Sequence, residues 1–229
     1  MKRFLVGAAA IAVAAAGCKG EASGPSTRQM TPAERQALIA TLTNSPQMGQ
    51  FGPVASAALL YVNEVGQMQL TTGPTTAAYT AVGLWMDINA TVSGAPLVTQ
   101  FFTVLAWQGT GSSISKISLV LGAGNTAPST ATLGPTFSGT TGGTAMFGDA
   151  PFSSGDVYVS TSGTFAVSAV SFVGPTAFSL GTLTGTYAPG TLMGSFSLTA
   201  MNGSGSSSSQ SADFSAGIPA VRVVVNGSI

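Results

Sequence analysis

The chain contains no histidine and one cysteine among its 229 residues. The missing histidine excludes a Ser-His-Asp or Cys-His mechanism, and it excludes zinc and copper sites with histidine ligands. The sequence also lacks a G-x-S-x-G elbow and a P-loop. We therefore expect no enzymatic activity and no bound cofactor.

Charged residues are scarce too, at 6% of the chain, where an average soluble domain has about 25%. Apolar residues make up 45%, which excludes the usual disordered class. After Asn44 the chain has two basic residues, Lys116 and Arg222, against five acidic ones, a net charge of −3. This balance excludes a nucleic-acid partner. The polar surface must then consist of Ser, Thr, Gly, Asn and Gln.

The first seventeen residues have the pattern of an export signal. Lys2 and Arg3 precede an apolar run over 4–17 that is too short for a comfortable transmembrane helix and ends in small residues. No run of about 18 apolar residues follows it, which excludes a bundle of membrane helices.

The end of this signal, Ala15-Ala16-Gly17-Cys18, resembles the lipobox of bacterial lipoproteins. The family usually has leucine where this chain has Ala15. The resemblance implies that residues 1–17 are removed and that Cys18 carries lipid (palmitate-type acyl chains) on its thiol and its new amino group. Several acyl chains anchor a protein stably. Lys19, in place of the aspartate that marks inner-membrane retention, implies the outer membrane, on either face.

An ordinary signal peptide is the alternative. Cleavage after Ala14-Ala15-Ala16 would leave Cys18 as a free thiol in an exported protein. A lone cysteine in such a protein calls for a special explanation, and lipidation supplies one.

The mature chain begins with a polar segment, 18–30, that we interpret as a flexible tether. A helix is predicted over 31–44, where Thr31, Pro32 and Glu34 form the start of a capping box. Its narrow apolar stripe favours packing on its own domain. The next segment, 53–65, suits a second helix or a strand, and we favour the helix.

From Tyr79 onward the hydrophobic period is two. Residues 80–92 alternate almost without a break and predict a half-buried strand, which a Ser-Gly-Ala-Pro turn at 93–96 joins to a second strand over 97–108. Further strands are predicted at 114–122, 156–161, 164–173, 177–187, 191–201 and 220–226. We expect Ala188-Pro189-Gly190 to be a hairpin turn.

Two segments interrupt this pattern. Residues 122–150 are rich in Gly, Thr, Ser and Pro, with one short strand around 144–147, and residues 202–211 are a low-complexity segment that predicts a mobile loop. Together, the predicted helices and strands indicate one mainly β domain over 31–229. We expect an antiparallel sandwich or small barrel of about eight or nine strands, preceded by one or two short helices.

Few residues suggest a binding site. Trp85 and Asp87 fall on the polar face of the strand at 80–92, where an exposed aromatic residue often marks a contact. Asp149 and Asp156 flank one loop and are the only plausible ligands for a hard cation. The more economical interpretation is that each aspartate forms a turn, so we expect no metal.

These observations predict a lipid-anchored, non-enzymatic envelope protein with a binding or structural role. Its partner could be an envelope protein, a glycan or an apolar ligand. One alternative is an envelope enzyme that acts on glycans through two carboxylates, which needs two acids facing one cleft. Another is an integral outer-membrane β-barrel, although the strands lack aromatic girdles and the last one does not end in an aromatic residue.

Overall fold

The computed structural model describes residues 26–44, 51–92, 94–111, 113–150, 157–180 and 182–228. Within these ranges the chain forms two helices and twelve strands, so the prediction of a mainly β fold is confirmed. The helices are α1 (Pro32–Asn44) and α2 (Phe51–Leu59). The strands are β1 (Arg28–Gln29), β2 (Glu64–Thr72), β3 (Thr75–Val92), β4 (Ala95–Gln108), β5 (Lys116–Ala123), β6 (Ser129–Gly134), β7 (Gly143–Asp149), β8 (Tyr158–Phe172), β9 (Thr176–Leu180), β10 (Leu183–Met201), β11 (Ser207–Asp213) and β12 (Ile218–Ser228).

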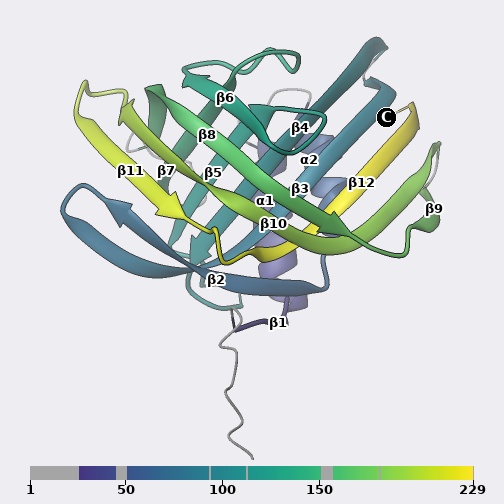
Figure 1. Cartoon of the computed structure of the whole chain (residues 1–229), viewed down its shortest axis with the longest axis horizontal. Helices are drawn as coiled ribbons and strands as arrows, with labels where there is room; N and C mark the ends of the chain where they lie inside the picture. The colour runs from purple at the N-terminus through teal and green to yellow at the C-terminus, as the bar shows by residue number, and fades with distance from the viewer. Residues whose placement is uncertain are drawn as a thin grey trace, which may run out of the picture.

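The strands form a single sheet that closes into a barrel (Figure 1). From β10 the hydrogen bonding passes through β12, β3, β4, β5 and β7 to β8, and β8 pairs again with β10. Strand β12 does not run along the whole length of β10 and β3. Over the rest of their length, β11 pairs with β10, β2 pairs with β3, and β11 and β2 pair with each other. The sheet is mixed and not purely antiparallel as expected, because β12 runs parallel to β3 and β6 parallel to β7.

The hairpin predicted around the Ser-Gly-Ala-Pro turn is confirmed. Strands β3 and β4 pair from Thr80 and Trp107 to Val92 and Ala95. The alternation places successive side chains on opposite faces of the sheet, as the period of two requires. This hairpin therefore contributes one row of residues to the outside of the barrel and one row to its interior.

Both faces of the sheet are buried over much of their area. The outer row of β3, with Val82, Leu84 and Met86, belongs to one apolar cluster that α1 and α2 cover. Both helices lie behind the strands in Figure 1. The inner row belongs to a second cluster that fills the middle of the barrel with side chains such as Phe165 and Phe196. A barrel of this size is closed in its middle by its own side chains.

Helix α1 begins as predicted. The Thr31 backbone N–H donates to the Glu34 carboxylate (3.0 Å), and the Glu34 N–H donates to the Thr31 hydroxyl (3.2 Å), which completes the capping box. Leu38 and Leu42 of the apolar stripe are fully buried, so the stripe packs on its own domain. The second helix, predicted over 53–65, is confirmed up to Leu59, but Glu64 and Val65 belong to β2.

The predicted tether, 18–30, is ordered at its end, which is a correction. Arg28 and Gln29 form β1 against the start of β2, and Met30 is buried. Arg28 binds the Glu34 carboxylate through both terminal nitrogens, at 2.5 and 2.9 Å. This bidentate contact explains why the segment holds one conformation. Residues 18–25 lie outside the described residues.

The hairpin turn expected at Ala188-Pro189-Gly190 is wrong, because β10 continues through these residues. On one side, β10 pairs with β9 up to Tyr187 and with β8 from Gly190 onward. The Pro189 carbonyl accepts from Val173 N–H on that side (3.1 Å). In an antiparallel strand the N–H of a residue points the same way as its carbonyl. The missing N–H of Pro189 therefore faces the junction between β9 and β8, where no ladder bond is lost.

The two strands predicted at 156–161 and 164–173 are one strand, β8, which continues through the expected Ser-Gly turn. Gly163, with φ of +146°, lies so close to β10 that a Cβ there would stand 2.4 Å from the Ser197 carbonyl oxygen. Glycine at this position allows the two strands to stay paired rather than turn apart.

The two segments expected to be loops also contain strands. In residues 122–150, β7 confirms the short strand predicted around 144–147, and β6 is a further strand that was not predicted; the low-complexity segment overlaps β11. Strand β11 satisfies its backbone between β10 and β2, and its one large polar side chain, Gln210, is buried and accepts from the Ser118 hydroxyl (2.5 Å). Serine-rich composition hid β11, which has no run of apolar residues, whereas β6 and β7 bury apolar side chains such as Leu133, Met146 and Phe147.

Close packing inside the barrel gives a stability prediction. A Cβ on Gly122 of β5 would stand 2.7 Å from both Ala131 Cβ and Phe165 Cδ1, whereas a Cβ on Gly134 of β6 would meet nothing within 4 Å. We expect Gly122→Ala to lower the free energy of unfolding by about 2 kcal/mol through overpacking. Gly134→Ala is the control and should change it by less than about 0.5 kcal/mol. Equal effects in urea denaturation would contradict this account of the packing.

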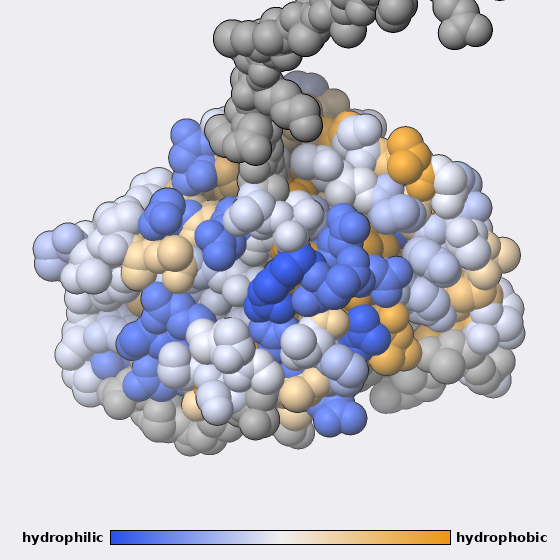
Figure 2. All heavy atoms as spheres, turned by 90° about the horizontal axis from the view of Figure 1, so that it is seen from below, coloured by the Kyte–Doolittle hydropathy of each residue, from blue (hydrophilic) through white to orange (hydrophobic). Residues whose placement is uncertain are grey.

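The exterior has few charges. In the view of Figure 2 the weakly coloured residues, such as serine, threonine and glycine, alternate with hydrophilic ones, and hydrophobic residues appear in separate small areas. Among the described residues, neither helix combines the length and apolarity needed to cross a bilayer.

Candidate functional site

One end of the barrel, which we call the mouth, forms a cavity of about 950 Å³ that is open to solvent. Its wall comes from the end of β3, the start of β4, the end of β5, the start of β6 and the residues before β7. These segments follow one another in the chain between residues 87 and 142, and the curvature of the sheet arranges them around one opening. The cavity is within the size range of small-molecule sites.

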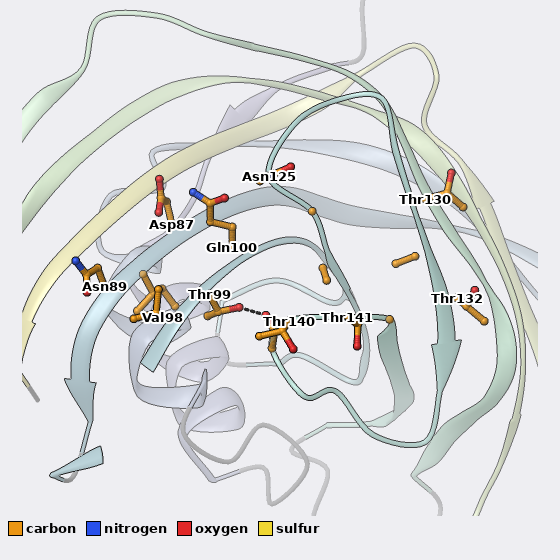
Figure 3. A pocket seen from close by; sticks show the side chains of 16 residues that line it. Asp87, Asn89, Val98, Thr99, Gln100, Asn125, Thr130, Thr132, Thr140 and Thr141 are labelled. Atoms are coloured by element: carbon orange, nitrogen blue, oxygen red, sulfur yellow. Dashed lines mark hydrogen bonds between the residues drawn. The ribbon is translucent and has the colours of Figure 1, made fainter. Parts of the chain in front are cut away.

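Strands β3 and β4 supply one wall. Asp87 and Asn89 follow Trp85 on the inner row of β3, and Gln100 lies opposite Asp87 on β4. Figure 3 shows these three side chains on the same side of the opening, with Val98 beside them. Amide and carboxylate groups offer both hydrogen-bond donors and acceptors along this wall.

The opposite wall consists of small polar residues. Asn125 of the β5–β6 connection and Thr130 and Thr132 of β6 lie across the opening from Asp87 and Gln100 (Figure 3). The Thr130 and Thr132 side chains are exposed and point away from the opening, because Ala131 between them faces the barrel interior. A third side of the cavity is formed by residues 139–142, which the buried Thr99 hydroxyl binds at the Gly139 carbonyl. The cavity is therefore lined by amides, a carboxylate and glycine backbone, together with apolar atoms of residues such as Ile88, Val98 and Ala131.

Below the cavity, Asp87 belongs to a cluster with Trp85 and Arg222. The Arg222 guanidinium lies over the Trp85 ring, 4.2 Å from its centroid, and its terminal nitrogen is 3.6 Å from Asp87 Oδ2. Trp85 also contacts Phe102 and Phe172, with ring centroids 5.4 and 5.6 Å away. The cation and the carboxylate balance each other, so this part of the mouth is close to neutral.

Two donors in this cluster lack a partner. The indole Nε1 of Trp85 and the Nε of Arg222 are buried and have no hydrogen-bond acceptor within the part of the chain that the structure describes. A buried donor without a partner costs free energy, about 1–3 kcal/mol. Neither side chain lines the mouth cavity, so the pair is a buried polar cluster beneath the cavity and not part of its wall.

The cluster makes a prediction about stability. Arg222→Met keeps an unbranched side chain of similar stem but removes the cation–π contact and leaves Asp87, which is 25% exposed, without its cation. We expect a loss of about 1 kcal/mol in urea denaturation. The control is Lys116→Met, because the Lys116–Asp149 pair is 54% and 63% exposed and should contribute less than about 0.5 kcal/mol. A larger loss for the control would contradict the assignment.

The structure places the predicted site residues as follows. Trp85 is half-buried and faces the barrel interior, since the polar face of its strand is the inner row, and Asp87 reaches the cavity. Asp149 is at the opposite end of the barrel and pairs with Lys116 (3.1 Å). Cys18 and Asp156 lie outside the described residues. Within the described ranges, no three His, Cys, Asp or Glu residues come together as a metal site.

Sequence reasoning missed most of the cavity wall. Asn89 and Gln100 share the inner phase of the predicted hairpin, so the period of two could have identified them. The residues at 123–142 lie in a Gly- and Thr-rich segment whose position depends on closure of the sheet, and no local pattern reveals that.

Comparison with known proteins adds nothing to this description. The chain matches no protein-family model, no curated protein and no solved structure.

Proposed function

We propose that the protein is a lipid-anchored protein of the bacterial envelope, in the outer membrane, that binds a neutral saccharide in the mouth of its barrel. The observation that carries the binding role is the mouth cavity, whose wall presents the amide groups of Asn89, Gln100 and Asn125 beside the Asp87 carboxylate. Binding needs no catalytic group, in agreement with a chain that has no histidine.

The anchor rests on the lipobox-like segment that ends at Cys18. Cys18 precedes Ser26, the first described residue, by eight positions. Eight residues span at most about 28 Å when fully extended. Acylation of Cys18 would therefore keep the barrel within that distance of the lipid surface, where envelope glycans are close at hand.

The lining of the cavity favours a saccharide over an apolar ligand. Asn89, Gln100 and Asn125 offer neutral donors and acceptors that match sugar hydroxyls. The Asp87–Arg222 pair adds no net charge, and the acidic balance of the barrel does not favour an anionic ligand. A concave site of this kind suits a small ligand or a chain end better than the surface of another protein.

The alternative of a glycan-active enzyme finds less support. Such an enzyme needs two carboxylates on one cleft. Among the described residues, the mouth cavity contains one carboxylate, Asp87, and the cavity at the opposite end contains one, Asp149. Each of them has a basic partner, Arg222 and Lys116 respectively.

The test is isothermal titration of the processed full-length chain, purified in detergent, with N,N′-diacetylchitobiose, cellobiose and maltose as probes. We expect at least one disaccharide to bind with a Kd of about 1 mM or lower. Gln100→Ala, which removes an amide from the mouth, should weaken binding about fivefold or more.

Gln108→Ala is the matched control, because it removes the same side chain from the other end of the same strand. It should leave disaccharide binding unchanged. Absence of binding for all three probes at about 10 mM would overturn the saccharide proposal. Equal effects of the two glutamine variants would overturn its assignment to the mouth.

A further inference from the structure

The opposite end of the barrel, which we call the base, contains a second cavity of about 470 Å³. It lies between the ends of β2, β4 and β7 and the starts of β3, β5 and β8. On β4, Gln100 of the mouth and Gln108 of the base are eight residues apart, about 26 Å along a strand. The apolar cluster in the middle of the barrel separates the two cavities.

Aromatic side chains distinguish the base cavity from the mouth. Tyr158 lies parallel to Phe147, with ring centroids 5.1 Å apart and an angle of 7° between the planes. Tyr79 lines the same cavity, together with the apolar Leu70 and Ala77. Three rings on one small cavity present flat apolar surface, which no wall of the mouth cavity offers.

The polar groups of the base are largely committed. The Gln210 side chain accepts from Ser118 (2.5 Å) and donates to the Thr72 hydroxyl (3.2 Å), and Lys116 binds Asp149 at the rim. By contrast, the Tyr79 and Tyr158 hydroxyls have no hydrogen-bond partner among the described residues. A ligand here would meet aromatic faces first and a small number of hydroxyl groups second.

We propose that the base cavity is a second binding site, independent of the mouth, for a planar aromatic ligand that carries a polar substituent. The ring stacks in the aromatic wall, where offset-stacked or edge-on contacts add to the burial of apolar area. The substituent exchanges a hydrogen bond with the Tyr79 or Tyr158 hydroxyl. Small-molecule sites commonly combine an apolar and aromatic lining with a few placed polar groups.

The experiment titrates 2-naphthol into the detergent-purified full-length chain and follows its fluorescence. Decahydro-2-naphthol, which has the same skeleton and hydroxyl but no flat ring, is the matched probe and should bind about tenfold more weakly in competition. Tyr158→Ala should weaken 2-naphthol binding about tenfold, whereas Tyr158→Phe keeps the ring and should weaken it by no more than about threefold.

Tyr79 is not part of the stacked Tyr158–Phe147 pair, so Tyr79→Phe tests the hydroxyl contact by itself. This variant should weaken 2-naphthol binding about two- to fivefold. Gln100→Ala in the mouth should leave 2-naphthol binding unchanged. Equal binding of the two naphthol probes would overturn the aromatic assignment, and no effect of Tyr158→Ala would overturn the site. If Tyr158→Ala weakened the binding of diacetylchitobiose more than that of 2-naphthol, the base cavity would be a saccharide site, and the aromatic proposal would be overturned. None of these outcomes bears on the mouth, which Gln100→Ala tests separately.

Discussion

Replacing Glu34 by alanine should lower the free energy of unfolding by about 3 kcal/mol. The Glu34 carboxylate has no exposed surface and accepts from four groups: Arg28, the Thr31 backbone and hydroxyl, and the Trp107 indole. Removing the carboxylate leaves the buried Trp107 Nε1 without an acceptor and removes the side-chain half of the capping box at the start of α1. Arg28, which is 40% exposed, can turn to water and recovers part of the loss.

Urea denaturation of the two chains measures this effect. Glu64→Ala is the control, because Glu64 is an exposed glutamate on the neighbouring strand β2, and it should change stability by less than about 0.5 kcal/mol. Glu34→Gln keeps the volume and part of the hydrogen bonding and should fall between them. A loss below about 1 kcal/mol for Glu34→Ala would mean that the network contributes little beyond an ordinary surface contact.

The same carboxylate makes stability depend on pH. Burial acts to raise the pKa of Glu34, but hydrogen bonds from Arg28, Thr31 and Trp107 outweigh burial and lower the pKa to about 2, from 4.5. Because the pKa is lower in the folded state, the contribution is complete above about pH 4.5 and disappears as the pH falls toward 2. The stability difference between the wild type and Glu34→Gln should therefore shrink over that interval. A difference that stays constant would contradict the assignment.

Replacing Cys18 by alanine should move the protein from the membrane fraction to the soluble fraction. In the proposed anchor, the acyl chains on Cys18 supply the hydrophobic surface that holds the chain to the lipid, and no helix of the described residues could take their place. Intact-mass spectrometry of the membrane fraction should show a wild-type chain that begins at Cys18 and carries acyl mass.

Ala15→Leu is the matched control for the anchor, because it introduces the residue that the lipoprotein family usually has at this position and leaves Cys18 in place. It should preserve or increase membrane attachment. A wild-type chain that begins near Gly17, has a free thiol and remains soluble would overturn the anchor. The saccharide site in the mouth would then belong to a secreted protein with one reactive cysteine.

The sequence correctly predicted those elements whose structure depends on residues close together in the chain. The hairpin of β3 and β4 follows from unbroken alternation, and α1 follows from Thr31 and Glu34 in a capping box. The errors occurred where long-range pairing decides the structure. Strand β10 passes through Pro189 because β9 gives way to β8 at that point, and β11 forms because β10 and β2 supply its hydrogen bonds.

The residues of the candidate site also fall into two groups, those that the local sequence predicted and those that long-range pairing places. Trp85 and Asp87 were found from the phase of their strand, although the polar face proved to be the interior of a closed barrel. Thr130 and Thr132 lie beside the cavity only because β6 pairs with β8 on the far side of the sheet. Their role depends on partners more than thirty positions away in the chain, which the spacing of hydrophobic residues does not encode.

The apolar cluster in the middle of the barrel has a consequence for traffic through the molecule. Phe165, Phe196 and Leu198 occupy the space between the mouth and the base, so within the described residues the two cavities are separate and no continuous channel runs through the barrel. A solute that enters at one end must leave by the same end. In the proposed binding role, release then depends on exchange with the fluid outside that opening, and a small molecule bound at one end is not passed to the other.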